Sequence, residues 1–193
     1  GYRRDEFWTA EGRRWRDIAG AAAPRNWKRE GVGWATRWFD AWHGLRPDDP
    51  VVQVNRHEAQ AWCRWAGRRL PTESEWEFAA RNGGREDRYP WGDAMPSTAL
   101  VLDYRLERPL PAPDPGPSAS GLEAMIGGVW EWTSSGFAPY PGFETDAYAE
   151  YSEPWFHTHG VLRGGCFATR SRLVHNRWRN FYLPHRNDVF AGF

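Results

Sequence analysis

"RLPTESEWEFAAR", residues 69–81, contains the clearest structural signals in the chain. Thr72 and Glu75 are spaced as a capping box, in which each side chain accepts a hydrogen bond from the other residue's backbone N–H. Apolar residues then recur at helical spacing, and the "NGG" that follows at 82–84 favours a helix end. The apolar residues are Trp76, Ala79 and Ala80. This stretch predicts a short amphipathic helix that begins at Thr72.

A second short helix is predicted just upstream, in "NRHEAQAWCRWAG" at residues 55–67. Asn55 and Glu58 form a variant of the same start signal. Gly67 can adopt the left-handed conformation that commonly ends a helix. The apolar residues at helical spacing are Ala59, Trp62, Cys63 and Ala66.

From about residue 89 the chain is rich in glycine, proline and aromatic residues, which is typical of short strands joined by turns. The best strand candidates are "VWEWT" at 129–133 and "GVLRGGCFA" at 160–168, where β-branched or aromatic residues alternate. We expect the proline-rich piece at 109–121 to wrap the surface, because it is too short to link two domains. The pattern predicts an α+β fold with two short helices, small irregular antiparallel sheets and little regular secondary structure.

The composition favours a single domain that binds small molecules. The 193 residues include 25 basic and 25 acidic side chains, so no net charge attracts nucleic acid or an anionic membrane. No apolar run approaches the roughly 18 residues that a membrane span needs, and we expect a cytoplasmic protein. The two cysteines, Cys63 and Cys166, are expected to be reduced thiols, since a secreted scaffold often carries more.

Four motifs, in their order and spacing, resemble the formylglycine-generating-enzyme superfamily, a variant of the C-type lectin fold. They are "RLPTESEWEFAAR", "YPWGD", "GGVWEWT" and "VLRGG", and together they span residues 69–165. Residues 1–193 are accordingly expected to form one sulfatase-modifying-factor domain of this type.

A narrower resemblance covers almost the whole chain. Its motifs are "GYRRDEFW", "PYPGF", "YAEYSEPWF", "RGGCFATRSRL" and "RNFYLPHRNDVFAGF". They are similar to the C-terminal domain of non-haem-iron sulfoxide synthases, which oxidise hercynine to form the carbon–sulfur bond of ergothioneine. Close relatives form the carbon–selenium bond of selenoneine.

The resemblance implies Fe(II) as cofactor, with O2, hercynine and a thiol or selenium donor as substrates. In the family, an N-terminal helical bundle supplies three histidine ligands to the iron. Nothing in this chain resembles that bundle, so we expect the chain to be part of a longer enzyme that carries the iron ligands elsewhere.

Two tyrosines in "YAEYSEPWF", residues 148–156, are the first site candidates. The resemblance implies that Tyr148 is the catalytic proton donor and that Tyr151 contacts the hercynine imidazole. A phenol with an ordinary pKa near ~10 stays protonated at neutral pH and can act as a general acid. The alternative is that both rings pack with Trp155 and Phe156 in the core.

The C-terminal segment "RNFYLPHR", residues 179–186, supplies the remaining substrate candidates. The resemblance places Asn180 at the trimethylammonium-carboxylate end of hercynine and Arg186 in the donor pocket. Phe181 and Tyr182 occupy the positions of a Trp-Asp pair in the enzymes that use γ-glutamylcysteine. Tyr182 cannot bind the ammonium group of that donor as an aspartate would, which favours cysteine or a selenosugar. Cys166 stands where most relatives have serine, which favours the selenoneine branch.

The same region carries six arginines between residues 163 and 187, with no acidic residue among them. They are Arg163, Arg170, Arg172, Arg177, Arg179 and Arg186. Guanidinium groups bind carboxylates and phosphates bidentately, so these side chains could hold anionic substrates. The alternative is pairing with the acidic stretch at residues 144–153.

Signals for a metal site within the chain are weak. His157 and His159 could lie on one side of a strand, but no third ligand is evident and an exposed loop is the better interpretation. "GGVWEW" resembles the family's calcium-binding turn "GNVWEW". Glu131 is retained, whereas Gly128 replaces the asparagine oxygen, so a structural calcium ion would lack one of its ligands.

Two further functions stay open beside the iron-dependent oxygenase. A copper-dependent formylglycine-generating oxidase needs two cysteines near the C-terminus, where the chain has only Cys166. A non-catalytic ligand-binding module of lectin-like fold is the other alternative, because a fold alone does not determine activity.

Overall fold

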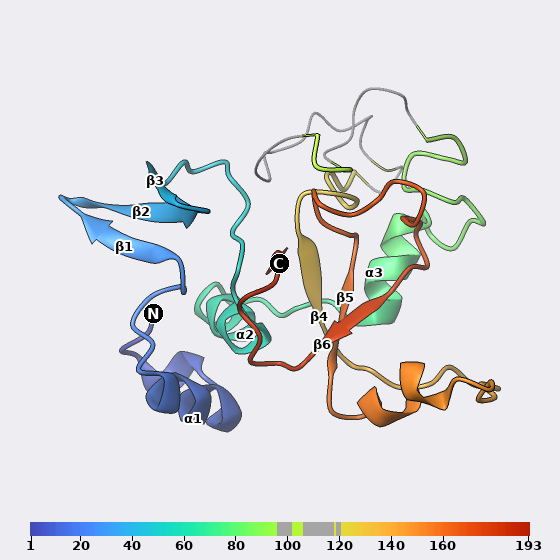
Figure 1. Ribbon diagram of the computed structural model, residues 1–193, viewed down its shortest axis with the longest axis horizontal. Helices are drawn as coiled ribbons and strands as arrows, with labels where there is room; N and C mark the ends of the chain where they lie inside the picture. Colours follow the sequence, from blue (N-terminus) through green and yellow to red (C-terminus); the bar gives the residue numbers. More distant parts are fainter. Residues whose placement is uncertain (96–101, 106–117, 119–120) are drawn as a thin grey trace.

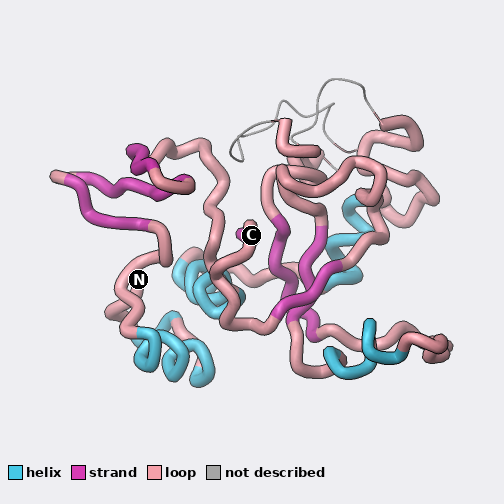
Figure 2. Tube along the Cα trace, in the orientation of Figure 1, coloured by secondary structure: helices cyan, strands magenta, loops and turns pink. Residues whose placement is uncertain are grey.

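The computed structural model describes residues 1–95, 102–105, 118 and 121–193. The predicted proline-rich wrap at 109–121 therefore lies almost entirely outside the described residues. The helices are η1 (Asp5–Phe7), α1 (Ala10–Ala19), α2 (Arg56–Trp65), α3 (Glu73–Ala80), η2 (Ala149–Tyr151) and η3 (Glu153–Trp155). The strands are β1 (Trp27–Glu30), β2 (Gly33–Trp38), β3 (Ala41–Gly44), β4 (Trp130–Gly136), β5 (Gly160–Arg163), β6 (Asn180–Tyr182) and β7 (Ala191–Gly192). Loops connect these short elements over much of the described chain (Figure 2). The predicted α+β class with little regular secondary structure is confirmed.

Both predicted helices form, and each begins with the predicted capping box. Asn55 caps α2 through reciprocal hydrogen bonds with Glu58, and Thr72 caps α3 through the same bonds with Glu75. Gly67 has a φ of 66°, as expected for the residue that follows the end of α2. One side of α2 faces the core, while Trp62 on the other side is 45% exposed.

The main sheet has the strand order β6-β5-β4-β7. Its pairs are antiparallel except β4 with β7, which is parallel and brings Ala191 beside Trp130. β4 confirms the predicted strand at "VWEWT". The second predicted strand ends at Arg163, because Gly164 and Gly165 adopt positive φ values of 88° and 78° that extended strands do not allow.

The hydrophobic core lies between this sheet and α2. Trp132 and Phe167 are almost completely buried there, and the Trp132 indole donates a hydrogen bond to the Val54 carbonyl at 3.0 Å. Helix α3 packs beside β4 and β5, which places its first turn near the end of the sheet where β6 begins (Figure 1).

A helix and a three-stranded sheet near the N-terminus were not predicted. The additional helix corrects the expectation of two helices. Helix α1 is capped by the Thr9 side chain, and β1, β2 and β3 form a separate antiparallel sheet beside α2 (Figure 1). Cations over aromatic rings stabilise this small sheet: Arg29 lies 4.4 Å from the ring of Trp34, and Lys28 lies 4.3 Å from that of Trp42. Within the described residues, no helix is long and apolar enough to cross a membrane.

Candidate functional site

Tyr148 and Tyr151 lie on the surface, at the start and the end of the short helix η2. Their side chains are 67% and 76% exposed, and their ring centroids are 6.4 Å apart. The Tyr148 backbone N–H donates to the Asp146 carboxylate at 2.7 Å, which fixes the entry into η2. The alternative of core packing for these two tyrosines is therefore wrong. Both phenols are free to contact a ligand or another domain.

A cluster of aromatic rings packs against the segment that carries the two tyrosines. Phe156 follows η3 and contacts Phe137 at the end of β4, with ring centroids 5.0 Å apart. Phe137 in turn stacks on Phe181 of β6 at 4.0 Å. The His159 ring meets Phe181 edge-on at 5.6 Å. We call these four residues the aromatic cluster; it connects the segment that carries the two tyrosines to β6.

Strand β6 brings Asn180 and Tyr182 onto one face of the sheet edge. The Asn180 amide donates to the Tyr182 hydroxyl at 3.2 Å, and the Arg186 guanidinium lies 5.6 Å from the Tyr182 ring. Arg186 also donates to Asp188 at 2.5 Å, and this bond lowers the pKa of the Asp188 carboxyl. The structure therefore groups three of the predicted substrate residues. Phe181 points the other way, into the aromatic cluster.

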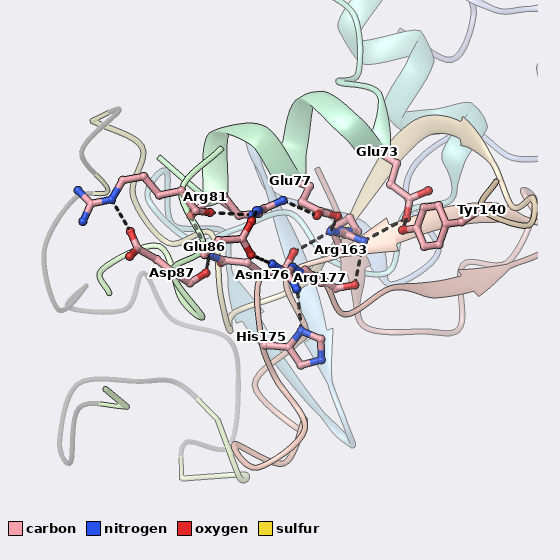
Figure 3. A network of polar contacts seen from close by, with 12 residues as sticks. Glu73, Glu77, Arg81, Glu86, Asp87, Tyr140, Arg163, His175, Asn176 and Arg177 are labelled. Carbon is pink, nitrogen blue, oxygen red and sulfur yellow. Dashed lines mark hydrogen bonds and ion pairs between the residues drawn. The ribbon is translucent and has the colours of Figure 1, made fainter. Parts of the chain in front are cut away.

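Five of the six arginines, all but Arg172, pair with acids among the described residues, and none of these acids belongs to the acidic stretch at 144–153 that was predicted as the alternative. Arg163 is fully buried and bonds two acids of α3, Glu73 at 3.1 Å and Glu77 at 2.6 Å (Figure 3). Its guanidinium also donates to the carbonyls of Asn176 and Arg177 at 2.7 and 3.2 Å. Arg163 is thus a structural residue that no substrate reaches.

Arg179, the residue before β6, bonds the same acid. Its guanidinium lies 2.6 Å from the Glu73 carboxylate and donates to the Ala138 carbonyl at 3.0 Å. It also stacks over Phe137 and Tyr140, at 4.6 and 4.4 Å from their ring centroids. The Tyr140 hydroxyl donates to Glu73 at 3.1 Å (Figure 3), and burial raises the pKa of that phenol.

Sequence reasoning identified neither Glu73 nor Tyr140. Both stood in quoted motifs, but nothing local indicates that an acid in the first turn of α3 meets arginines about 90 and 106 residues later.

Glu131 on β4 lies beside Arg163 of β5 and lines a cavity of about 830 Å³. Its carboxylate accepts a hydrogen bond from the Trp76 indole at 2.6 Å, and burial raises its pKa to about 7. The cavity is mostly apolar, and Trp62, Phe193 and the carboxyl of Glu58 also line it. Burial likewise raises the Glu58 pKa to about 7. None of the tyrosine, asparagine or arginine candidates lines this cavity.

The residues around Glu131 fit a calcium ion poorly. Calcium takes six to eight oxygens, whereas one Glu131 oxygen already accepts from Trp76 and the Gly128 carbonyl already accepts from the Phe167 N–H. In the part of the chain that the structure describes, no group of three or more histidine, cysteine, aspartate or glutamate side chains lies together. The described residues therefore do not offer the three histidine ligands that the resemblance implies for an iron site.

The two thiols are free and buried, as predicted. Cys63 belongs to α2, whereas Cys166 follows β5 and lies 3.5 Å from the Thr169 hydroxyl. Burial raises the pKa of both thiols, which makes the metal-binding thiolate scarce. The arrangement gives no support to a copper site built from paired cysteines.

The model of the sulfatase-modifying factor enzyme 1-like domain matches residues 2–193. The chain belongs to this family. The fold agrees: it superposes on the Treponema denticola variable protein 1 with a TM-score of 0.63 at 19% identity, over 93% of this chain and 78% of that one. PvdO from Pseudomonas aeruginosa gives a TM-score of 0.59 at 18% identity, over 94% and 74%. The predicted lectin-like, formylglycine-generating-enzyme fold is confirmed.

Curated relatives are more informative than the solved structures. A protein named hercynine oxygenase from Mycolicibacterium thermoresistibile is 44% identical over the whole chain, and another from Mycolicibacterium smegmatis is 41% identical. A formylglycine-generating enzyme from Streptomyces coelicolor is 37% identical over 71% of the chain. The narrower resemblance to hercynine-oxidising enzymes is thus confirmed. The chain spans about half the length of these relatives, with 45%, 47% and 46% of each covered.

Proposed function

We propose that this chain is the substrate-binding domain of an O2-dependent enzyme that forms a C–S or C–Se bond on the imidazole of hercynine. The observation that carries the proposal is the identity of 41–44%, over the entire chain, to three proteins named hercynine oxygenase. In this proposal Fe(II) supplies the O2 chemistry, and its ligands come from residues outside this chain.

The exposed tyrosines take the roles that the family motif suggests. Tyr148 delivers a proton from its phenol as a general acid. Tyr151 orients the hercynine imidazole through a hydrogen bond. Two adjacent exposed phenols beside stacked rings suit a surface that becomes enclosed when substrate and a second domain are present, because exposed aromatic side chains mark binding sites.

Asn180 of β6 and Arg186, which follows this strand, bind the charged ends of the two substrates. The Asn180 amide contacts the trimethylammonium-carboxylate end of hercynine. Arg186, held by Asp188 and lying over Tyr182, faces an anionic group of the donor. Phe181 acts indirectly, since its ring is stacked on Phe137.

The donor is proposed to be cysteine or a selenosugar. Tyr182 offers a hydroxyl where an aspartate would bind the ammonium group of γ-glutamylcysteine. The Cys166 thiol is 5% exposed and bonded to Thr169, so it favours selenium only as a sequence pattern and does not contact the donor.

The test uses the full-length parent enzyme, loaded with Fe(II) and incubated with O2, hercynine and one donor at a time. The donors are cysteine, γ-glutamylcysteine and a selenosugar, and products are identified by mass spectrometry. We expect a hercynine adduct with cysteine or the selenosugar and little with γ-glutamylcysteine. Absence of any adduct from the metal-loaded protein would refute the proposal.

Tyrosine variants test the assigned roles. Tyr148→Phe is expected to lower kcat by about 100-fold, the usual contribution of a positioned general acid. Tyr151→Phe is expected to weaken hercynine binding. Tyr104→Phe is the matched control, since Tyr104 is 57% exposed and its ring packs on Phe167, outside the aromatic cluster. Equal activity of all three variants would remove both tyrosines from the site.

A non-catalytic module of lectin-like fold is the second candidate. It shares its fold with the proposed oxygenase domain, and a fold alone does not determine activity. Hercynine that binds the full-length protein in calorimetry, without turnover under any donor, would support this candidate instead.

A further inference from the structure

We propose that Glu73 and Arg179 are positioning residues, which set the shape of the substrate surface on β6 although neither touches substrate. This inference rests on the proposed function, since it takes Asn180 on β6 as the contact to hercynine. It assigns a role to a buried ion pair that the substrate-binding residues do not include.

Glu73 connects every element that borders the surface. Its backbone N–H donates to the Ser135 hydroxyl on β4 at 2.9 Å, and its carboxylate accepts from Tyr140, Arg163 and Arg179. The side chain is 10% exposed, so these bonds are largely shielded from water and from salt. Glu73 at the start of α3 is therefore bonded to β4 through its backbone, and to β5, the loop after β4 and the residue before β6 through its carboxylate. Figure 3 shows Tyr140 and Arg163 at this carboxylate.

Arg179 transmits this constraint to the substrate residues. It directly precedes Asn180, so the direction of its side chain fixes where β6 begins. Its guanidinium lies 4.6 Å from the ring centroid of Phe137 and 4.4 Å from that of Tyr140, and Phe137 stacks on Phe181 at 4.0 Å with an interplanar angle of 17°. Glu73 thus holds Arg179, and Arg179 holds β6 both through the backbone and through the aromatic cluster.

Geometry, and not charge alone, is needed here. A guanidinium offers a planar fork that bonds Glu73 and the Ala138 carbonyl at once while its face covers the two rings. A lysine ammonium would keep the positive charge beside Glu73 but can form neither the fork nor the stacked contact. Lysine at position 179 therefore separates the positioning role from the electrostatic one.

The main experiment compares Arg179→Lys with Arg177→Lys in the full-length enzyme. Arg177 is the matched control, because it pairs with Glu86 at the exposed rim, with side chains 54% and 78% exposed. We expect Arg179→Lys to raise the KM for hercynine about five- to tenfold with kcat within about twofold, since a displaced contact loses uniform binding. Arg177→Lys is expected to leave both constants unchanged.

A second, milder variant guards against misfolding. Tyr140→Phe removes only the hydroxyl that bonds Glu73, and Tyr2→Phe removes a comparable phenol–carboxylate bond to Glu58 at the other end of the fold. We expect Tyr140→Phe, but not Tyr2→Phe, to raise the hercynine KM and to speed amide hydrogen exchange in residues 137–143 and 180–182.

The outcomes separate this inference from the proposed function. Unchanged exchange in those two segments, together with an unchanged KM in Arg179→Lys and Tyr140→Phe, would overturn the positioning role. A wild-type enzyme without any hercynine turnover would refute the proposed function, and the exchange measurement would then decide alone whether Glu73 and Arg179 set the arrangement of β6.

Discussion

Replacing Arg163 by methionine is the most informative test of how this fold is held together. Arg163 is fully buried and donates to two carboxylates and two backbone carbonyls. Methionine fills a similar length but donates nothing, so the half-buried Glu77 loses its 2.6 Å bond to Arg163 and keeps only the longer contact with Arg81 at 3.4 Å. Glu73 keeps Arg179 and Tyr140, so it loses only part of its stabilisation.

The expected cost follows from these contacts. Breaking a buried ion pair by removing one partner typically costs about 3–5 kcal/mol, because the remaining charge stays desolvated. For a chain of this size, 1 kcal/mol changes Tm by about 2–4 °C, so Tm should fall by about 6–20 °C. The free energy of unfolding is measured by urea denaturation followed by circular dichroism, with Tm from calorimetry.

Arg177→Met is the control, since its exposed pair with Glu86 should contribute no more than about 1 kcal/mol. The double variant Arg163→Met/Glu77→Gln should recover part of the loss, because it also removes the Glu77 charge that Arg163 had paired. The reasoning would be refuted if Arg163→Met lowered the free energy of unfolding by less than about 1 kcal/mol. It would also be refuted if the double variant lost more free energy of unfolding than the two single variants together.

Three further predictions concern titration, reactivity and backbone conformation. Burial raises the pKa of Glu131 to about 7, so the folded state holds this proton more tightly than the unfolded state. The free energy of unfolding should therefore fall as pH rises from about 5 to 8. Urea titrations at each pH should show a smaller fall for Glu131→Gln. Cys63 and Cys166 should react slowly with Ellman's reagent in the native protein and rapidly in denaturant, since both thiols are buried; fast native reaction would contradict their burial. Gly164→Ala should lower the free energy of unfolding by about 2 kcal/mol or more, because φ at this position is 88° and a Cβ would lie 2.5 Å from a backbone carbonyl oxygen. Gly20→Ala, where a Cβ would meet open space, should cost about 1 kcal/mol. Urea denaturation measures both.

The parts of the fold that the sequence predicted are those that depend on local chemistry. Both capping boxes, at Asn55 and at Thr72, involve residues three positions apart, and both form as expected. The N-terminal sheet was missed because β3 is exposed throughout and β1 carries mostly polar residues, so hydrophobic alternation gives no signal. Its stabilising contacts are cations over tryptophan rings, which spacing alone does not reveal.

In the candidate site, too, the sequence predicted the local features, and only the structure shows the contacts between distant residues. The motif located Tyr148 and Tyr151, but only the structure places their rings on the surface. Counting charges identified a surplus of arginines near the C-terminus, yet not that α3 supplies the acids of Arg163 and Arg179, which lie 90 and 106 residues from Glu73. Phe181 likewise read as a substrate contact, whereas its ring is committed to Phe137.

The parallel pairing of β7 with β4 has a consequence for biosynthesis. About 55 residues separate the end of β4 at Gly136 from Ala191, which is fully buried and fills a place in the core. A ribosome that adds about 5–20 residues per second would take roughly 3–11 s to make that interval. During this time the outer edge of β4 has no strand to pair with and can recruit another nascent chain. Chaperone binding during synthesis should therefore concentrate in the interval before Ala191 emerges.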